Sequence, residues 1–255
     1  MSDVMDAAVG LVQRRDFAGA RALLQREVDA GRATGGEKLL LLDVLDRLHD
    51  HAAVLALADD LDGRSGPVGG RHVVVHSAAI GIARARALHA TNRNHEAAAA
   101  AREAIAELDR NGGVVAGFTG LGPHLAYSTL GSVEVALERF EAGIEAYQQA
   151  LSRWDRRSDR DCEHCAHFDL GNAYKGIGDL GAALASTRRA IELEPGHADS
   201  WFNLACYYAL LGYPDDAVSA LTRSIGLARD NAASARDDPD FASLRDDPRF
   251  VELTR

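Results

Sequence analysis

The sequence predicts an all-α protein, an α-solenoid of about six helix-turn-helix units followed by a C-terminal cap. Two consecutive segments of 34 residues, 164–197 and 198–231, repeat the same apolar positions. A unit of this length cannot bury its apolar face alone and has to stack on neighbours. Of the 255 residues, 47% are hydrophobic and 26% are charged, which is enough apolar material for a core.

The N-terminal region, residues 1–111, is expected to hold three divergent units, because its apolar residues recur at helical spacing although its motifs are faint. The stretch LLLLDVLDRL in the second unit is typical of a buried helix. The Gly and Pro residues of DGRSGPVGGR end helices and build loops, so we expect an insert there. The units are predicted at 1–34, 35–68 and 78–111, and the insert at 69–77.

The segment NGGVVAGFTGLGP is predicted to form a Gly-rich loop between repeats, over residues 112–123. Gly117 and Gly122 have the spacing found in a phosphate-binding loop. The next residues are Pro123 and His124, however, where such a loop needs Lys and then Ser or Thr to reach the phosphates and a metal ion. We therefore expect this segment to connect two repeats and not to bind a nucleotide.

The region 124–231 contains three clear units, at 124–157, 164–197 and 198–231. Their residues resemble the tetratricopeptide repeat, whose pattern is an aromatic residue, Leu-Gly, Tyr, Ala, a second aromatic, Ala and a late Pro. Glu134 stands in the first of these units where the pattern has Tyr. The residues that match are Tyr127, Leu130, Gly131, Phe140, Ile144, Tyr147 and Ala150 in the first unit, Leu170, Gly171, Tyr174, Gly178, Ala183, Ala190 and Pro195 in the second, and Trp201, Leu204, Tyr208, Gly212, Ala217 and Leu221 in the third.

The resemblance implies a right-handed superhelix of helix pairs. Small residues such as Gly171 and Ala183 let the two antiparallel helices of a unit approach closely, while large apolar residues fill the gaps between units. The tail, residues 232–255, carries the sequence DDP-x-F twice and resembles an ending of bacterial tetratricopeptide proteins. We expect it to cap the last unit, because the apolar face at the end of a repeat array must be covered.

Tetratricopeptide arrays bind partners in a concave groove lined by the first helix of each pair, so the resemblance implies a peptide segment or a partner protein as the ligand. The groove positions of the three clear units hold both apolar and hydrogen-bonding residues. An Asn amide both donates and accepts, which matches a peptide group. The predicted partner-binding residues are Ser128, Ser132, Phe168, Asp169, Asn172, Lys175, Phe202 and Asn203.

The charge balance argues against nucleic acid as a partner. Lys and Arg total 28 against 38 Asp and Glu, a net charge of −10, whereas binding to phosphates needs a basic face. No apolar run approaches the ~18 residues of a membrane span, and the acidic start does not resemble a signal peptide. Three cysteines are an odd number and cannot form a complete disulfide framework. Together these features predict a cytoplasmic protein. The Ala- and Arg-rich composition is typical of a bacterial one.

No catalytic motif is found, so the sequence predicts no enzyme activity, no cofactor and no metal. His95-Glu96 lacks the second His of a zinc-protease helix, and no Ser stands in a G-x-S-x-G elbow. The favoured function is a non-catalytic scaffold or adaptor. One open alternative is a helical accessory domain that assembles homo-oligomers. The other is a metal- or thiol-dependent sensor that uses the cluster Cys162, His164, Cys165 and His167.

Overall fold

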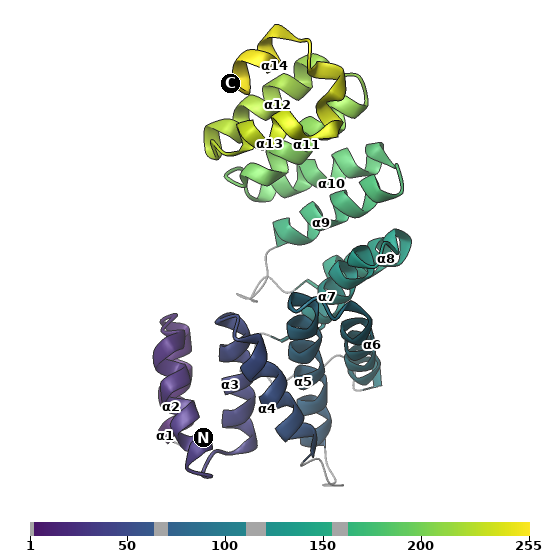
Figure 1. Cartoon of the computed structure of the whole chain (residues 1–255). Helices are drawn as coiled ribbons and strands as arrows, with labels where there is room; N and C mark the ends of the chain where they lie inside the picture. The colour runs from purple at the N-terminus through teal and green to yellow at the C-terminus, as the bar shows by residue number, and fades with distance from the viewer. Residues whose placement is uncertain (1–2, 64–70, 111–120, 155–162) are drawn as a thin grey trace. The chain divides into compact units, whose positions relative to one another are not determined.

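The computed structural model describes residues 3–63, 71–110, 121–154 and 163–255, and in these ranges it contains helices and turns but no strand (Figure 1). The all-α prediction is confirmed. Among the described helices, none is both long enough and apolar enough to cross a membrane. The helices of the repeat units are α1 (Asp3–Gln13), α2 (Phe17–Asp29), α3 (Gly35–Arg47), α4 (His51–Gly63), α5 (Arg71–Ala90), α6 (Asn94–Arg110), α7 (Pro123–Ala136), α8 (Phe140–Ser152), α9 (Glu163–Gly176), α10 (Leu180–Leu193), α11 (Ala198–Leu210) and α12 (Pro214–Leu227).

The chain divides into two compact units, which are described separately. The N-terminal unit comprises Met1–Arg139 and Gln149–Asp161, and the C-terminal unit comprises Phe140–Gln148 and Cys162–Arg255. The division passes through α8. Within the units, successive helices such as α5 and α6, α9 and α10, or α11 and α12 pack against each other.

The insert predicted at 69–77 is wrong in its extent, because α5 already begins at Arg71. From Arg71 to Ala90 the sequence contains no Pro, so nothing in it forces the helix to stop. Residues 112–120 of the predicted Gly-rich loop lie outside the described residues. The end of that segment starts α7, with Pro123 in the first turn, where a missing N–H costs nothing.

The core of the N-terminal unit is built around α3, which contacts α2, α4 and α5. Leu39–Leu42 and Leu45 are at most 1% exposed. Four consecutive leucines point to all sides of a helix, so α3 is buried all round. A capping box begins this helix: the Thr34 hydroxyl accepts from the Glu37 N–H at 3.3 Å, and the Glu37 carboxylate accepts from the Thr34 N–H at 2.7 Å.

The turn inside each helix pair contains one residue with a left-handed backbone. The faint repeats share this feature with the clear ones. A glycine adopts this conformation at no steric cost, whereas other residues are strained by about 1 kcal/mol or more. The repeated turn therefore marks the units even where their motifs are faint. The residues, with their φ angles, are Arg15 (60°), His49 (56°), Asn92 (61°), Glu138 (58°), Gly178 (78°) and Gly212 (78°).

Substitutions at these turns are expected to change stability in opposite directions. Glu138→Gly should raise the free energy of unfolding by up to about 1 kcal/mol, because it relieves the strained φ, and Gly178→Ala should lower it by about 1 kcal/mol. Glu145→Gly, in the exposed middle of α8, is the matched control and should lower it by about 1 kcal/mol. Urea denaturation followed by circular dichroism measures all three. If Glu138→Gly destabilises as much as the control, strain at the turn is not the cause.

In the C-terminal unit, α9 and α10 approach closely at Gly171. A Cβ on Gly171 would lie 2.5 Å from the Thr187 hydroxyl oxygen and 3.4 Å from the Ala183 carbonyl oxygen. The repeat pattern requires a small residue here for that reason. The apolar core of this unit then continues through α11 and α12 to Leu221, which is fully buried.

The tail folds onto the same core, and its two DDP-x-F sequences begin their short helices in the same way. In each, the second Asp accepts a hydrogen bond of 2.9 Å from the N–H two residues later, and Pro starts a short helix. The two rings, Phe241 and Phe250, are at most 3% exposed, with centroids 5.5 Å apart. These are contacts that a cap would make; the capping role itself stays a prediction. The tail elements are α13 (Asn231–Asp237), the 3-10 helix η1 (Pro239–Leu244) and α14 (Pro248–Leu253).

Candidate functional site

The predicted groove residues of the C-terminal unit lie on the first helices of two successive pairs, α9 and α11. Their central feature is a pair of amides. Asn203 Nδ2 donates to Asn172 Oδ1 at 2.6 Å, and the Tyr207 hydroxyl donates to the same oxygen at 3.1 Å. Both asparagines are half-buried, so the pair is held in place while remaining accessible to a ligand.

This amide pair leaves hydrogen-bonding capacity unused. Asn172 Nδ2 and Asn203 Oδ1 make no hydrogen bond to any of the described residues. The pair therefore offers one donor and one acceptor, which are the two partners that a peptide group of an extended ligand needs.

The start of α9 adds an aromatic ring one turn before Asn172. The half-buried ring of Phe168 packs edge-on against His197, with centroids 5.2 Å apart. His197 in turn shares a hydrogen bond of 2.8 Å with the buried Ser200 through its Nδ1 atom. Asp169, also half-buried, follows on the same helix. This part of the predicted groove thus combines an apolar surface with a carboxylate.

Two other predicted groove residues are contacted by the tail of the chain itself. The Lys175 ammonium group pairs with the Asp240 carboxylate of η1. Phe202 packs edge-on against Phe241, with ring centroids 5.6 Å apart. No sequence motif indicates that the tail reaches these positions, because the contact joins Lys175 to a residue 65 positions later.

A buried thiol lies beside these tail contacts. The Cys206 sulfur and one carboxylate oxygen each from Asp238 and Asp240 lie within 4.8 Å of one another, which is a donor set that a metal could use. Burial raises the pKa of Cys206 well above its ordinary range, with the two aspartates acting in the same direction. The thiol therefore stays protonated at neutral pH, and Asp240 already binds the Lys175 ammonium. Because the thiol is protonated and Asp240 already has a cationic partner, we interpret the cluster as a packed polar contact and not as a metal site.

The predicted groove residues of the N-terminal unit, Ser128 and Ser132, bond to the backbone of their own helix. Ser128 is buried, and its hydroxyl donates to the Leu125 carbonyl at 3.2 Å. The Ser132 hydroxyl donates to the Ser128 carbonyl at 3.2 Å. Partner contact at Ser128 would need this buried hydroxyl to turn outward, so Ser132 is the more accessible of the two.

The cysteine and histidine cluster at the start of α9 is described only in part, because Cys162 lies outside the described residues. Cys165 is disulfide-bonded, and its sulfur lies 3.6 Å from His164 Nε2. Burial lowers the pKa of His167, although Glu163 opposes this effect. A thiol-dependent role for the cluster stays a hypothesis.

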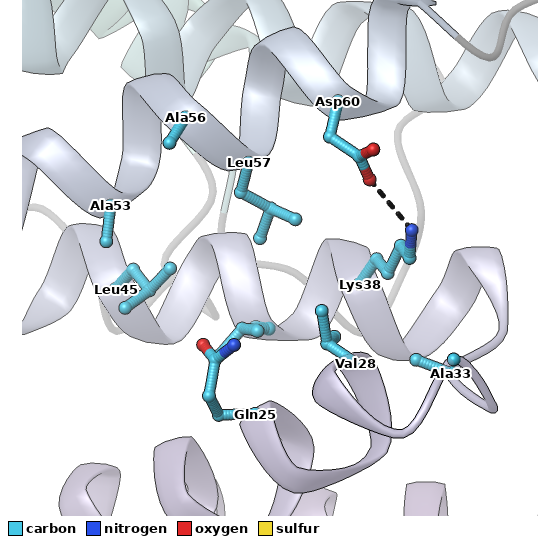
Figure 2. Close-up of a pocket in the computed structure, with 11 residues that line it drawn as sticks. Gln25, Val28, Ala33, Lys38, Leu45, Ala53, Ala56, Leu57 and Asp60 are labelled. Carbon is cyan, nitrogen blue, oxygen red and sulfur yellow. Dashed lines mark hydrogen bonds and ion pairs between the residues drawn. The ribbon is translucent and has the colours of Figure 1, made fainter.

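A pocket of about 400 Å³, which the sequence did not predict, lies in the N-terminal unit between α2, α3 and α4 (Figure 2). At one end, Lys38 Nζ pairs with Asp60 Oδ2 at 2.8 Å, and the Lys38 side chain is only 11% exposed. Lys38 is one of two lysines in the chain. Its position on a leucine-rich helix is the only sequence feature that could have indicated this pocket. The lining residues are Gln25, Val28, Gly31, Ala33, Lys38, Leu41, Leu45, Ala53, Ala56, Leu57 and Asp60.

The amino-acid sequence matches known protein families in its C-terminal half. Models of the tetratricopeptide repeat match residues 124–194 and 187–219. Among curated proteins, none shows significant sequence similarity to the chain.

Solved structures with this fold are 14–19% identical to the chain in sequence. The chain is 19% identical to YrrB, described as a TPR protein with an unusual peptide-binding site; the match covers 81% of this chain and 93% of YrrB, with a TM-score of 0.55. A MamA RS-1 double mutant is 14% identical over 77% of this chain and 97% of its own, with a TM-score of 0.57. A further MamA structure is 18% identical over 67% and 90%, with a TM-score of 0.51.

At these identities the solved structures show the fold alone, an α-solenoid of helix pairs. The family-model matches cover the region where the repeat motifs are clear, and the repeated left-handed turn occurs in the earlier helix pairs as well. The chain therefore contains tetratricopeptide repeats within residues 124–194 and 187–219, and its fold is the α-solenoid of helix pairs found in these solved structures.

Proposed function

We propose that this chain is a non-catalytic scaffold of the bacterial cytoplasm, which binds an extended segment of a partner protein in the groove of its C-terminal unit. The observation that carries the proposal is the amide pair of Asn172 and Asn203, with one donor and one acceptor left without a partner among the described residues. The description of YrrB as a peptide-binding protein of the same fold supports it.

The chemistry of the groove suits a peptide better than a small metabolite. Asn172 and Asn203 can bond to a peptide group, and Phe168 lies one helical turn before Asn172, where it can receive an apolar side chain of the same segment. Asp169 gives this end of the groove a negative charge. At this end of the groove, a segment that places an apolar side chain on Phe168 and a polar or basic side chain near Asp169 therefore fits.

Replacing Asn172 and Asn203 by alanine should lower the affinity for the partner by about tenfold or more. Each hydrogen bond lost from a desolvated peptide group costs about 1 to 3 kcal/mol. The partner is first captured from lysate of the native organism on immobilised full-length protein and identified. Its affinity for wild-type protein and for Asn172→Ala/Asn203→Ala is then measured by calorimetry.

Thr222→Ala serves as the control, since Thr222 is on a second helix, α12, and its hydroxyl donates to the Val218 carbonyl of that helix. It should leave the affinity unchanged. Circular dichroism checks that the double variant keeps its helix content. Binding at full affinity by a folded double variant would contradict the proposed groove.

A further inference from the structure

We propose that residues 238–250 of the tail are an internal ligand of the groove on α11, and that this groove takes segments in which a carboxylate directly precedes an aromatic ring. The proposal rests on the groove function proposed above and deepens it. It names the chemistry of the partner segment and a competitor that the chain itself carries.

The tail contacts the groove through two adjacent residues. The Asp240 carboxylate pairs with the Lys175 ammonium on α9, and the Phe241 ring packs edge-on against Phe202 on α11, with centroids 5.6 Å apart. Lys175 and Phe202 are both groove positions of the repeat pattern. One carboxylate and one ring therefore reach the first helices of two successive pairs.

The contacts on α11 lie along one face of that helix. Besides Phe202, the tail approaches Cys206, whose sulfur is within 4.8 Å of an Asp240 carboxylate oxygen, and the Ala209 carbonyl, which accepts from the Ser243 hydroxyl at 3.3 Å. Residues 202, 206 and 209 are spaced i, i+4 and i+7, which places them on a single side of the helix. A ligand in a helix-lined groove is held at this spacing of anchors.

The ion pair between Lys175 and Asp240 distinguishes an internal ligand from a tail that only caps the last helix pair. Covering the apolar end of the last helix pair needs the buried side chains of Phe241, Leu244 and Phe250. It does not need Asp240, whose partner Lys175 belongs to the preceding pair. Lys175 is also one of only two lysines in the chain, so this basic groove position is specifically matched by an acidic tail residue.

The tail and a partner segment of the same chemistry exclude each other. A carboxylate and a ring from a partner can reach Lys175 and Phe202 only when Asp240 and Phe241 have left them. The apparent affinity for the partner is then reduced by the fraction of chains whose groove is open. The 3-10 helix η1 is six residues long, and such short helices have little stability of their own, so opening can be local to the tail.

The test uses a fluorescein-labelled synthetic peptide of residues 236–251 and the full-length protein, with fluorescence anisotropy as the readout. Wild-type protein should bind this peptide weakly, because its own tail occupies the groove. The full-length variant Asp240→Ala/Phe241→Ala should bind it at least about tenfold more tightly, since its groove is open. Adding Lys175→Ala to that variant should remove most of the gain. A peptide that carries the same two alanines should not bind.

Asp240→Ala alone keeps the test decisive if the double variant loses helix content, because it removes no apolar core residue. It should increase both amide hydrogen exchange within residues 238–250 and the affinity for the peptide. A folded variant that binds the peptide no better than wild type would overturn the proposal. The Asn172 and Asn203 experiment measures the native partner independently, so failure of the peptide competition leaves the proposed groove function standing.

Discussion

Removing both arginines that face Glu134 is expected to destabilise the N-terminal unit by about 3 to 5 kcal/mol, because the change leaves a buried carboxylate without a counter-charge. Glu134 is 1% exposed and pairs with Arg102 of α6 and, at 3.5 Å, with Arg139 at the start of α8. Arg102→Met/Arg139→Met removes both charges while keeping apolar chains of similar length. Urea denaturation followed by circular dichroism gives the loss in free energy of unfolding.

The matched control puts the same two substitutions on a Glu134→Met background. With no carboxylate to leave unpaired, the two Arg substitutions should then cost less than about 1 kcal/mol, because an apolar side chain of similar volume replaces a buried ion pair at little cost. The two arginines are each about half exposed, so Glu134→Met alone leaves their charges in water. Equal losses on the two backgrounds would show that the arginines stabilise through packing and not through charge.

Glu134 also shows how far the repeat pattern predicts the structure. The pattern identified this position as one where Tyr is usual, as at Tyr174 and Tyr208, and thus identified a departure. The pattern could not identify the residue that neutralises the Glu134 carboxylate, because Arg102 lies 32 residues away in the preceding helix pair. A motif describes contacts within a unit and between standard neighbours, whereas an ion pair between two particular side chains is specific to this chain.

The helix pairs themselves were predictable because periodicity reports burial directly. The position of α3 followed from its leucines, and the turns after α9 and α11 from Gly178 and Gly212. The corresponding turns at Arg15 and His49 have the same left-handed φ without a glycine, so no residue type marked them. The start of α5 was placed too late because a Gly and Pro cluster predicts a loop without fixing its end.

For the candidate site, the sequence predicted which helices carry the residues. Repeat position placed Asn172 and Asn203 on successive first helices, but the bond between their amides depends on how two helices pack, which no motif states. The tail contact with Phe202 was missed for a related reason. The tail with its repeated DDP-x-F predicts a cap on the last unit, whereas the surface on which its residues dock depends on the fold of the whole C-terminal unit.

The C-terminal unit allows a direct comparison of a buried and an exposed leucine on one helix. Leu204 is 5% exposed and belongs to the core cluster that includes Tyr207, Leu221 and Phe241, while Leu210, near the end of the same helix, is 44% exposed. Leu204→Ala should cost about 2 to 5 kcal/mol, the sum of lost apolar burial and the cavity left behind.

Leu210→Ala removes the same atoms from a surface position and should cost less than about 0.5 kcal/mol. Thermal denaturation and amide hydrogen exchange of α11 and α12 measure both variants. Because the tail shares the cluster through Phe241, Leu204→Ala should also speed exchange in η1, whereas Leu210→Ala should not. If the two substitutions cost the same, α11 does not present Leu204 to the core and Phe202 to the groove, and the placement of the groove on this helix fails with it.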